Sequence, residues 1–282
     1  MAETRIAVIG CGGRVGRMLL ADIAATPGCA LAGGVAREGS AVLGQDLGQL
    51  AGIGPLGIAA GDDPEALLRA ADVAIEFTTP AATAEHATLA ARLGKPLVIG
   101  TTGLHGAEEE AVGAAARLVP IVWAANTSLG VNLLLGLVAQ VAARLGPEWD
   151  LEIMEMHHRG KVDAPSGTAL ALGRAAAEAR GVAFDEAAVR GRDGITGPRP
   201  SGAIGFAALR GGDNIGEHHV LFAGQGEQLE LTHRATNRGI YAKGAVRAAL
   251  WLLGQKPGLY GMKEVLGLWP LNESGQIDIF GS

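Results

Sequence analysis

The residues best suited to chemistry lie together in one segment, EIMEMHHRGKVDAPSGTAL, which runs from Glu152 to Leu170. Two imidazoles, those of His157 and His158, come just before the ammonium group of Lys161. A histidine can take up or release a proton near neutral pH, and a lysine can hold an anion or donate a proton. These residue types at this spacing predict proton transfer beside a bound anion.

This chemistry needs a strand that ends at the histidines and a helix that begins after them. The residues from Glu152 to Met156 alternate in character and predict the end of a strand. On a regular strand His157 and His158 would point to opposite faces, which argues against their holding one metal ion. Ser166 is a good N-cap, and residues 167–179 predict a helix rich in alanine.

The start of that helix predicts an anion site. The backbone N–H groups of Gly167 and Thr168 have no partners inside a helix, and the helix dipole favours negative charge there. Gly167 lets a ligand approach the backbone closely, and Lys161 would reach the same place. A carboxylate is the expected guest. A single histidine or lysine in a loop is more often solvated or structural, so the joint spacing carries this prediction.

A second group of candidates follows an apolar run from Arg5 to Ile9, where GCGGRVG leads into a predicted helix. Strand, glycine-rich turn and helix form the context of a dinucleotide phosphate site, in which Gly16 would let the helix pack near the strand. Val15 occupies the third glycine position of a strict GxGxxG, so on its own the turn could be only a packing turn. The predicted cofactor contacts here are Gly10, Cys11, Gly12, Gly13, Arg14 and Val15.

The rest of the N-terminal half alternates strands with helices and predicts an α/β fold, a Rossmann-like doubly wound parallel sheet. Predicted strands run into FTTP, GTTG and AANTS. Because ligands of such sheets bind beyond the carboxyl ends of the strands, small and polar residues at these ends are candidate cofactor contacts. They are Gly100, Thr101, Thr102, Ala124, Ala125, Asn126 and Thr127.

The end of the second predicted strand, Ala30 to Ala36, bears on the choice of cofactor. An acidic residue there would bind the ribose hydroxyls of NAD, whereas a cation favours the 2′-phosphate of NADP. Here Ala36 is followed by Arg37. We therefore expect NADPH to be preferred over NADH, with Arg14 also near the phosphates. The alternative is that Arg37 is a solvated residue after a strand.

The C-terminal half predicts a smaller α+β domain for substrate binding and oligomerisation. Three segments alternate in character and predict antiparallel strands, namely Ala203–Arg210, Glu217–Ala223 and Gln228–Thr236. The irregular segment 181–201 contains three arginines and could be a mobile lid or a solvated loop, of which we favour the loop. We expect residues 129–236 to form this domain, and residues 1–128, completed by 237–282, to bind the dinucleotide.

Composition narrows the classes of function. The 282 residues carry a net charge of −6, which disfavours nucleic acid and anionic membranes as partners. The two cysteines, Cys11 and Cys29, have no disulfide or zinc spacing and indicate a cytoplasmic protein. The N-terminus does not resemble a signal peptide, and the most apolar helix candidate, 131–145, is too short and polar to span a bilayer.

The segment from Glu152 onward resembles the signature of the dihydrodipicolinate (4-hydroxy-tetrahydrodipicolinate) reductase family. The shared pattern is E, two residues, E, one residue, H, three residues, K, one residue, D, one residue, PSGTA. The similarity extends from the first glycines to GAVRAALWLLG near residue 254. It implies NAD(P)H-dependent reduction of 4-hydroxy-tetrahydrodipicolinate to tetrahydrodipicolinate with loss of water, in the diaminopimelate route to lysine.

The resemblance also implies residue roles and a homotetramer built through the second domain. It makes His157 the acid/base residue and Lys161 a proton donor. It assigns the dicarboxylate substrate to His158, Gly167 and Thr168, and the nicotinamide side to the GTT and AAN segments. This sequence departs from the family pattern at four positions. They are Ala36 in place of an acidic residue, Thr79 in place of an arginine, Thr127 in place of an aromatic residue and Gly160 in place of a histidine.

Other functions remain open from the sequence. One is a dehydrogenase of another small dicarboxylate or imine on the same scaffold. Another is a non-catalytic NADP-binding sensor, which would have no need of the HHRGK and PSGT groups. A serine hydrolase using Ser166 is poorly supported, because that serine is not in a GxSxG elbow. The segment 266–282 extends beyond much of the family and has no predicted role.

Overall fold

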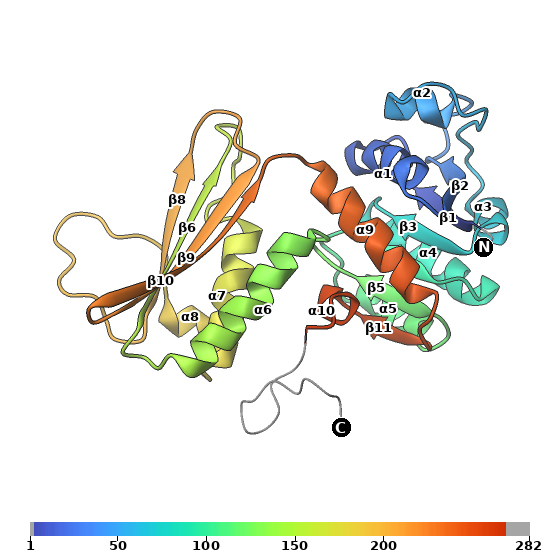
Figure 1. The fold of residues 1–282 in the computed structure, drawn as a ribbon. Coiled ribbons are helices and arrows are strands. Elements are labelled where there is room, and N and C mark those ends of the chain that lie inside the picture. The colour runs from blue at the N-terminus through green and yellow to red at the C-terminus, as the bar shows by residue number, and fades with distance from the viewer. Residues whose placement is uncertain (1–2, 269–282) are drawn as a thin grey trace. The chain divides into compact units, whose positions relative to one another are not determined.

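A computed structural model describes residues 3–268, which form two compact units (Figure 1). The first unit contains the residues up to Leu129 together with Gly239–Leu266, and the second contains Gly130–Arg238 with the described residues after 266. The part of the predicted domain assignment that concerns 269–282 lies outside the described residues. No described helix is both long and apolar enough to cross a membrane.

The first unit is built on a six-stranded parallel sheet with the order β11-β5-β4-β3-β1-β2. The strands are β1 (Thr4–Ile9), β2 (Cys29–Val35), β3 (Val73–Glu76), β4 (Leu97–Ile99), β5 (Pro120–Trp123) and β11 (Gly258–Tyr260). β3 and β4 are buried along their whole length, as central parallel strands covered on both faces must be. The predicted doubly wound sheet is confirmed, with β11 as a strand that the sequence did not indicate.

Helices cover both faces of this sheet. They are α1 (Arg14–Ala25), α2 (Leu47–Ala51), α3 (Pro64–Ala70), α4 (Pro80–Leu93), α5 (Ala107–Ala116), α9 (Gly239–Leu252) and α10 (Met262–Val265). Ile6 and Val8 of β1 pack into one core with α1 and α9, while Ala7 and Ile9 pack into the other with α3, α4 and α5. This alternation along β1 is the two-residue period of a strand with a helix layer on each side.

The second unit contains a five-stranded mixed sheet with the order β10-β9-β6-β8-β7. Its strands are β6 (Asp150–His157), β7 (Ala188–Val189), β8 (Ile204–Arg210), β9 (Gly216–Gly224) and β10 (Glu227–Ala235). Its helices are α6 (Leu129–Arg144), α7 (Gly167–Ala179) and α8 (Phe184–Ala187). Leu151 and Ile153 of the central strand β6 face the core, in which α6 and α7 pack.

The prediction of three antiparallel strands is only partly right. β9 and β10 pair in antiparallel fashion, but β8 pairs in parallel with β6, which lies between β8 and β9. Parallel neighbours need a crossover connection, and α7 supplies it between β6 and β8. The alternating residue character predicted the strands but not their order in the sheet. That order depends on which strands are joined by a crossover connection.

The segment 181–201 is tied to β6 by two of its arginines. Arg192 makes a two-pronged ion pair with Glu152, with donor–acceptor distances of 3.0 and 2.8 Å. Arg199 bonds Glu152 at 2.9 Å and Asp150 at 2.8 Å, and it also donates to the carbonyl oxygens of Leu151 and Ala203. These arginines are therefore held by the sheet, and the prediction of a loop that is only solvated is wrong for them.

Candidate active site

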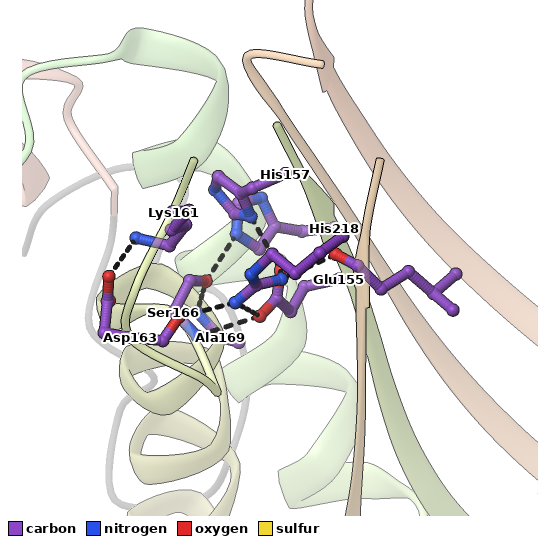
Figure 2. A network of polar contacts seen from close by, with 9 residues as sticks. Glu155, His157, Lys161, Asp163, Ser166, Ala169 and His218 are labelled. Carbon is purple, nitrogen blue, oxygen red and sulfur yellow. Dashed lines mark hydrogen bonds and ion pairs between the residues drawn. The ribbon is translucent and has the colours of Figure 1, made fainter. Parts of the chain in front are cut away.

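The predicted catalytic residues lie where β6 ends and the loop to α7 begins (Figure 2). His157 is the last residue of β6, and Lys161 follows in the loop. Ser166 caps α7, since its hydroxyl oxygen accepts a hydrogen bond from the backbone N–H of Ala169 at 3.2 Å. The predicted strand, loop, cap and helix are all confirmed.

Glu155 is the centre of the polar network in this region, although its side chain is only 1% exposed. Its carboxylate accepts two hydrogen bonds from the guanidinium of Arg210, both at 2.8 Å, and one from the backbone N–H of Ser166 at 3.1 Å. Burial alone would raise the pKa of Glu155, but hydrogen bonds from Arg210 and His157 outweigh it and hold the pKa below its ordinary value. Glu155 is therefore ionised at neutral pH.

His157 contacts the same carboxylate through one ring nitrogen. Its Nδ1 lies 2.6 Å from Oε2 of Glu155, and its side chain is 12% exposed. Burial lowers the pKa of His157, and the positive charges of Lys161 and Arg210 act in the same direction, while Glu155 opposes them. His157 is consequently a neutral imidazole near pH 7, which is the form that can accept a proton.

A second, deeper histidine stands behind this pair. Nε2 of His218 on β9 lies 3.0 Å from the hydroxyl oxygen of Ser166, and its ring meets that of His157 edge to face at 5.2 Å. Burial lowers the pKa of His218 to about 4, so that this ring is neutral near pH 7. Because the Ser166 side chain is buried and already bonded to His218 and Ala169, it is poorly placed to act as a nucleophile.

The predicted substrate residues all follow His157 along the chain. The ammonium group of Lys161 donates to the Asp163 carboxylate at 2.8 Å, which leaves further protons on Nζ for a ligand. His158 is half-buried and directly follows β6. Gly167 is exposed at the first position of α7, and Thr168 comes next. Cationic and N–H groups thus follow a proton-accepting imidazole in the same segment of the chain.

The glycine turn of the first unit lines a pocket. Its walls are Gly13, Arg14, Val15, Gly16, Phe77, Thr78, Gly100, Thr101 and Thr102. Gly10 has φ 90°, and an added Cβ would clash with the carbonyl oxygen of Phe77. A Cβ at Gly16 would clash with the carbonyl oxygen of Gly10, which confirms that this glycine permits close packing of α1 on the turn. The pocket has the bare backbone and helix N-terminus that a pyrophosphate requires.

Three of the predicted cofactor residues turn their side chains inward, and one of them, Thr101, donates its hydroxyl to the buried Glu76. Cys11 is fully buried, and its N–H bonds the carbonyl of Val35 at 3.0 Å. Thr127 is buried, and its hydroxyl donates to the carbonyl of Tyr241 at 2.7 Å. The other candidates, by contrast, include several exposed residues at strand ends or in the glycine turn. These are Gly13, Arg14, Arg37, Thr102 and Ala125.

The buried carboxylate of Glu76, which was not predicted from the sequence, holds two residues that line this pocket. Glu76, the last residue of β3, is 0% exposed and accepts hydrogen bonds from the hydroxyls of Thr78, Thr83 and Thr101. Thr101 Oγ1 in turn accepts from the backbone N–H of Thr78 at 2.8 Å. Since Thr78 and Thr101 both line the pocket, Glu76 helps to fix the shape of its wall.

Comparison with known proteins covers almost the whole chain. Residues 4–127 match the family described as dihydrodipicolinate reductase, N-terminus, and residues 130–266 match its C-terminal counterpart. The chain belongs to the dihydrodipicolinate reductase family. This confirms the resemblance on which the residue roles were predicted.

Relatives and solved structures of dihydrodipicolinate reductases agree with this assignment. The 4-hydroxy-tetrahydrodipicolinate reductase of Parvibaculum lavamentivorans is 54% identical over 95% of this chain and 99% of its own length. That of Brucella abortus is 53% identical over 93% and 98%. A dipicolinate-bound dihydrodipicolinate reductase from Paenisporosarcina sp. TG-14 has a TM-score of 0.75 and 25% identity over 94% of this chain and 100% of its own. An amine dehydrogenase from Mycobacterium smegmatis, with a TM-score of 0.57 and 16% identity, shares the fold.

The polar network around His157 contains residues to which the sequence alone assigned no role in the site. Glu155 stands in the family pattern, but its spacing gave it no role. Arg210 and His218 lie far along the chain and reach the site only because β8 and β9 flank β6. The register of β6 with β8 pairs His157 with Arg210, and the register of β6 with β9 pairs Glu155 with His218. No local sequence pattern predicts either pair.

Proposed function

We propose that this chain is an NAD(P)H-dependent 4-hydroxy-tetrahydrodipicolinate reductase, which forms tetrahydrodipicolinate with loss of water in diaminopimelate and lysine biosynthesis. The observation that carries the proposal is the neutral His157, held by buried Glu155, immediately before Lys161 and the N-terminus of α7. The names of relatives more than 50% identical over nearly the whole chain agree with it. A cytoplasmic location is expected, where the unpaired Cys11 and Cys29 would stay reduced.

The proposed proton chemistry uses His157 as a base and then as an acid. The ring carbon between the imine carbon and the hydroxyl-bearing carbon is acidic, and Nε2 of His157 removes a proton from it. Lys161 protonates the hydroxyl group, which departs as water. NAD(P)H, which the glycine-turn pocket would hold, would supply a hydride to the carbon that lost the hydroxyl. The imidazolium of His157 then returns its proton to the neighbouring carbon, and Lys161 regains its proton from solvent.

The two substrate carboxylates need positive or N–H groups. We assign them to the backbone N–H groups of Gly167 and Thr168 at the start of α7, to His158 and to Lys161. This assignment is supported by the exposure of Gly167 and by the Paenisporosarcina reductase, whose structure holds the dicarboxylate dipicolinate. The non-catalytic sensor is disfavoured, because it would not need a base held by a buried carboxylate.

We also propose that NADPH is the preferred cofactor. Arg37 lies just beyond the end of β2 and is exposed, as is Arg14 at the start of α1, while Ala36 offers no carboxylate to the ribose. The predicted contacts at the glycine turn, at 100–102 and at 124–127 complete the assignment. Replacing Arg37 with alanine should lower kcat/KM for NADPH while leaving that for NADH little changed. A wild-type enzyme that prefers NADH would contradict this proposal.

A homotetramer built through the second unit is the proposed assembly. The core-forming helices lie on one face of its sheet, and the other face exposes Met154 of β6 and Leu209 of β8. An uncovered sheet face with exposed apolar side chains is suited to contact with another copy. Light scattering should give the mass of four chains, and Leu209→Glu should reduce it. A monomeric wild-type protein would exclude this assembly.

The test of the proposed function is a coupled assay. The synthase that acts before the reductase would generate the substrate from pyruvate and aspartate semialdehyde, and oxidation of NADPH and NADH would be followed by absorbance. Turnover that requires every component supports the proposal. Cofactor binding without turnover would overturn it in favour of a dehydrogenase of another dicarboxylate or imine, which a panel of such substrates would then identify.

A further inference from the structure

The carboxylate of Glu155 has its full complement of hydrogen bonds. Oε1 accepts from Nη2 of Arg210 at 2.8 Å and from the backbone N–H of Ser166 at 3.1 Å. Oε2 accepts from Nη1 of Arg210 at 2.8 Å and lies 2.6 Å from Nδ1 of His157. A carboxylate offers about four acceptor positions. All of these positions are occupied here. The guanidinium of Arg210 and the backbone N–H of Ser166 can act only as donors.

An ionised carboxylate in this position determines which nitrogen of His157 carries the proton. Two acceptors 2.6 Å apart would repel each other, so Nδ1 must be the protonated nitrogen of the neutral ring. Its Nε2 then carries the lone pair. Within the described chain Nε2 makes no hydrogen bond, and it lies beside Gly216 of β9, where an added Cβ would come within 3.0 Å. The glycine leaves room next to the free lone pair.

We propose that Glu155 is a positioning residue that keeps the proton of His157 on Nδ1 and so presents Nε2 as the base that receives the substrate proton. Arg210 and the N–H of Ser166 keep the carboxylate ionised and fixed in orientation. The inference rests on the proposed function, in which His157 acts first as a base. It adds the tautomer of that base and the residue that selects it.

The environment of His157 leaves Glu155 as the group that can select this tautomer. The charged and titratable groups facing the ring are Glu155 on its own strand, Arg210 on β8, His218 on β9 and Lys161 in the loop. Arg210 and Lys161 are cations that can only donate, and His218 is neutral above its low pKa. Among these groups, only the carboxylate of Glu155 can accept a hydrogen bond from a protonated Nδ1 of His157.

Glu155→Gln should reverse the tautomer for a structural reason. The amide oxygen is expected at the Oε1 position, because two donors need an acceptor there, the N–H of Ser166 and Nη2 of Arg210, whereas Nη1 of Arg210 alone donates at the Oε2 position. The amide NH₂ group then occupies the Oε2 position and donates to Nδ1 of His157. The ring proton moves to Nε2, which can no longer act as a base. We expect a fall in kcat of at least roughly 10²-fold, with KM little changed.

The experiment is ¹⁵N NMR of histidine-labelled full-length protein without substrate, near pH 8, with His157 assigned by the signals lost in His157→Gln. The wild type should show Nδ1 protonated, and Glu155→Gln should show Nε2 protonated. Glu155→Asp keeps a carboxylate, so it should retain the wild-type tautomer and more of kcat than Glu155→Gln. The matched control is Glu152→Gln on the same strand, whose carboxylate binds Arg192 and Arg199 and should affect neither.

The pH profile adds a readout that a merely structural role would not move. Glu155 is the group that raises the pKa of His157 against the effect of burial. Glu155→Gln should therefore shift the acidic limb of the residual kcat profile to lower pH. A wild-type His157 protonated on Nε2, or a Glu155→Gln variant with the wild-type tautomer or full kcat, would overturn the inference. Because the tautomer is read without substrate, failure of the proposed reductase activity would be seen separately in the coupled assay.

Discussion

The two units each bury a glutamate at the carboxyl end of a sheet strand, but they surround it in opposite ways. Glu155 in the second unit is matched by Arg210 and by a titratable ring, His157. Glu76 in the first unit is enclosed by threonine hydroxyls, and among the described residues no lysine or arginine pairs with it. Nδ1 of His86 lies 3.8 Å from its carboxylate, too far for a hydrogen bond.

The difference separates two uses of a buried carboxylate. A charged partner keeps Glu155 ionised, and an ionised Glu155 controls where the proton of His157 lies. The threonine hydroxyls around Glu76 are neutral and do not set the protonation state of a neighbouring group. Each is a directional hydrogen-bond donor that fixes the position of the chain segment that carries it. Substitutions around Glu155 are therefore expected to lower mainly kcat. Substitutions around Glu76 are expected to change mainly the shape of the pocket wall.

The largest effect is expected from His157→Gln, which removes the base and leaves its support in place. We expect kcat to fall by about 10²–10⁴-fold, the usual contribution of general acid–base catalysis, with little change in KM. Stability should change little, because Arg210 still pairs with Glu155. Steady-state kinetics and a urea midpoint measure the two quantities. Retention of full activity would remove His157 from the mechanism.

Lys161→Ala tests the other proton-carrying group of the same site. Its partner Asp163 is more than half exposed, so losing this ion pair should cost little stability. Both kcat and substrate binding should suffer, with kcat/KM lower by roughly 10²-fold or more, because Lys161 is assigned as proton donor and as anchor. A variant with a raised KM but unchanged kcat would leave only the anchoring role.

Arg210→Met tests whether the charge of Glu155 depends on its cation. The variant leaves a buried carboxylate without its main partner, which should lower the free energy of unfolding by about 3 kcal/mol, the lower end for broken buried pairs. The control is Arg190→Met, because Arg190 pairs with the exposed Asp185 and should contribute less than about 1 kcal/mol. Equal urea midpoints for the two variants would show that Glu155 does not need Arg210.

The pH dependence of stability should report His218. Its pKa is about 4 in the folded protein and lies below the ordinary value of 6.5, so the unfolded chain binds the proton more readily. Stability is then fully present above about pH 6.5 and is lost as the pH falls towards 4, by up to roughly 3 kcal/mol. Urea midpoints across this range measure it. His218→Gln should flatten the profile, and an unchanged slope would contradict the assigned burial effect.

How far sequence alone reaches is clear from these two carboxylates. The strands that end at Glu76 and His157 were predicted, because their apolar or alternating patterns are local. So were His157, Lys161 and the cap at Ser166, because they stand in one continuous segment. The partners of the carboxylates were not predicted. Arg210 reaches Glu155 from 55 residues away, and Thr101 reaches Glu76 from 25 residues away, through strand order and register that local patterns do not encode.

Short elements of the first unit were missed for a related reason. No element was predicted between residues 38 and 61, yet α2 forms there. The Asp46 carboxylate accepts hydrogen bonds from backbone N–H groups in the first turn of α2 and from those of Leu56 and Gly57, where the chain returns. One side chain therefore organises a loop whose ends are distant in sequence. A five-residue helix has too few residues for a periodic signal.

The smallest effects are expected at Glu76, where each threonine hydroxyl can be removed alone. Thr83→Val and Thr101→Val should each cost about 1–2 kcal/mol of stability, because one donor to a buried carboxylate is lost. Only Thr101 lines the pocket and also accepts from the N–H of Thr78, so only Thr101→Val should raise KM for the nicotinamide cofactor. Neither change should alter the kcat pH profile, since these hydroxyls donate to Glu76 and not to the groups assigned to proton transfer, His157 and Lys161. A shifted pH profile in either variant would mean that Glu76 acts through charge, as Glu155 does, and the contrast between the two units would fail.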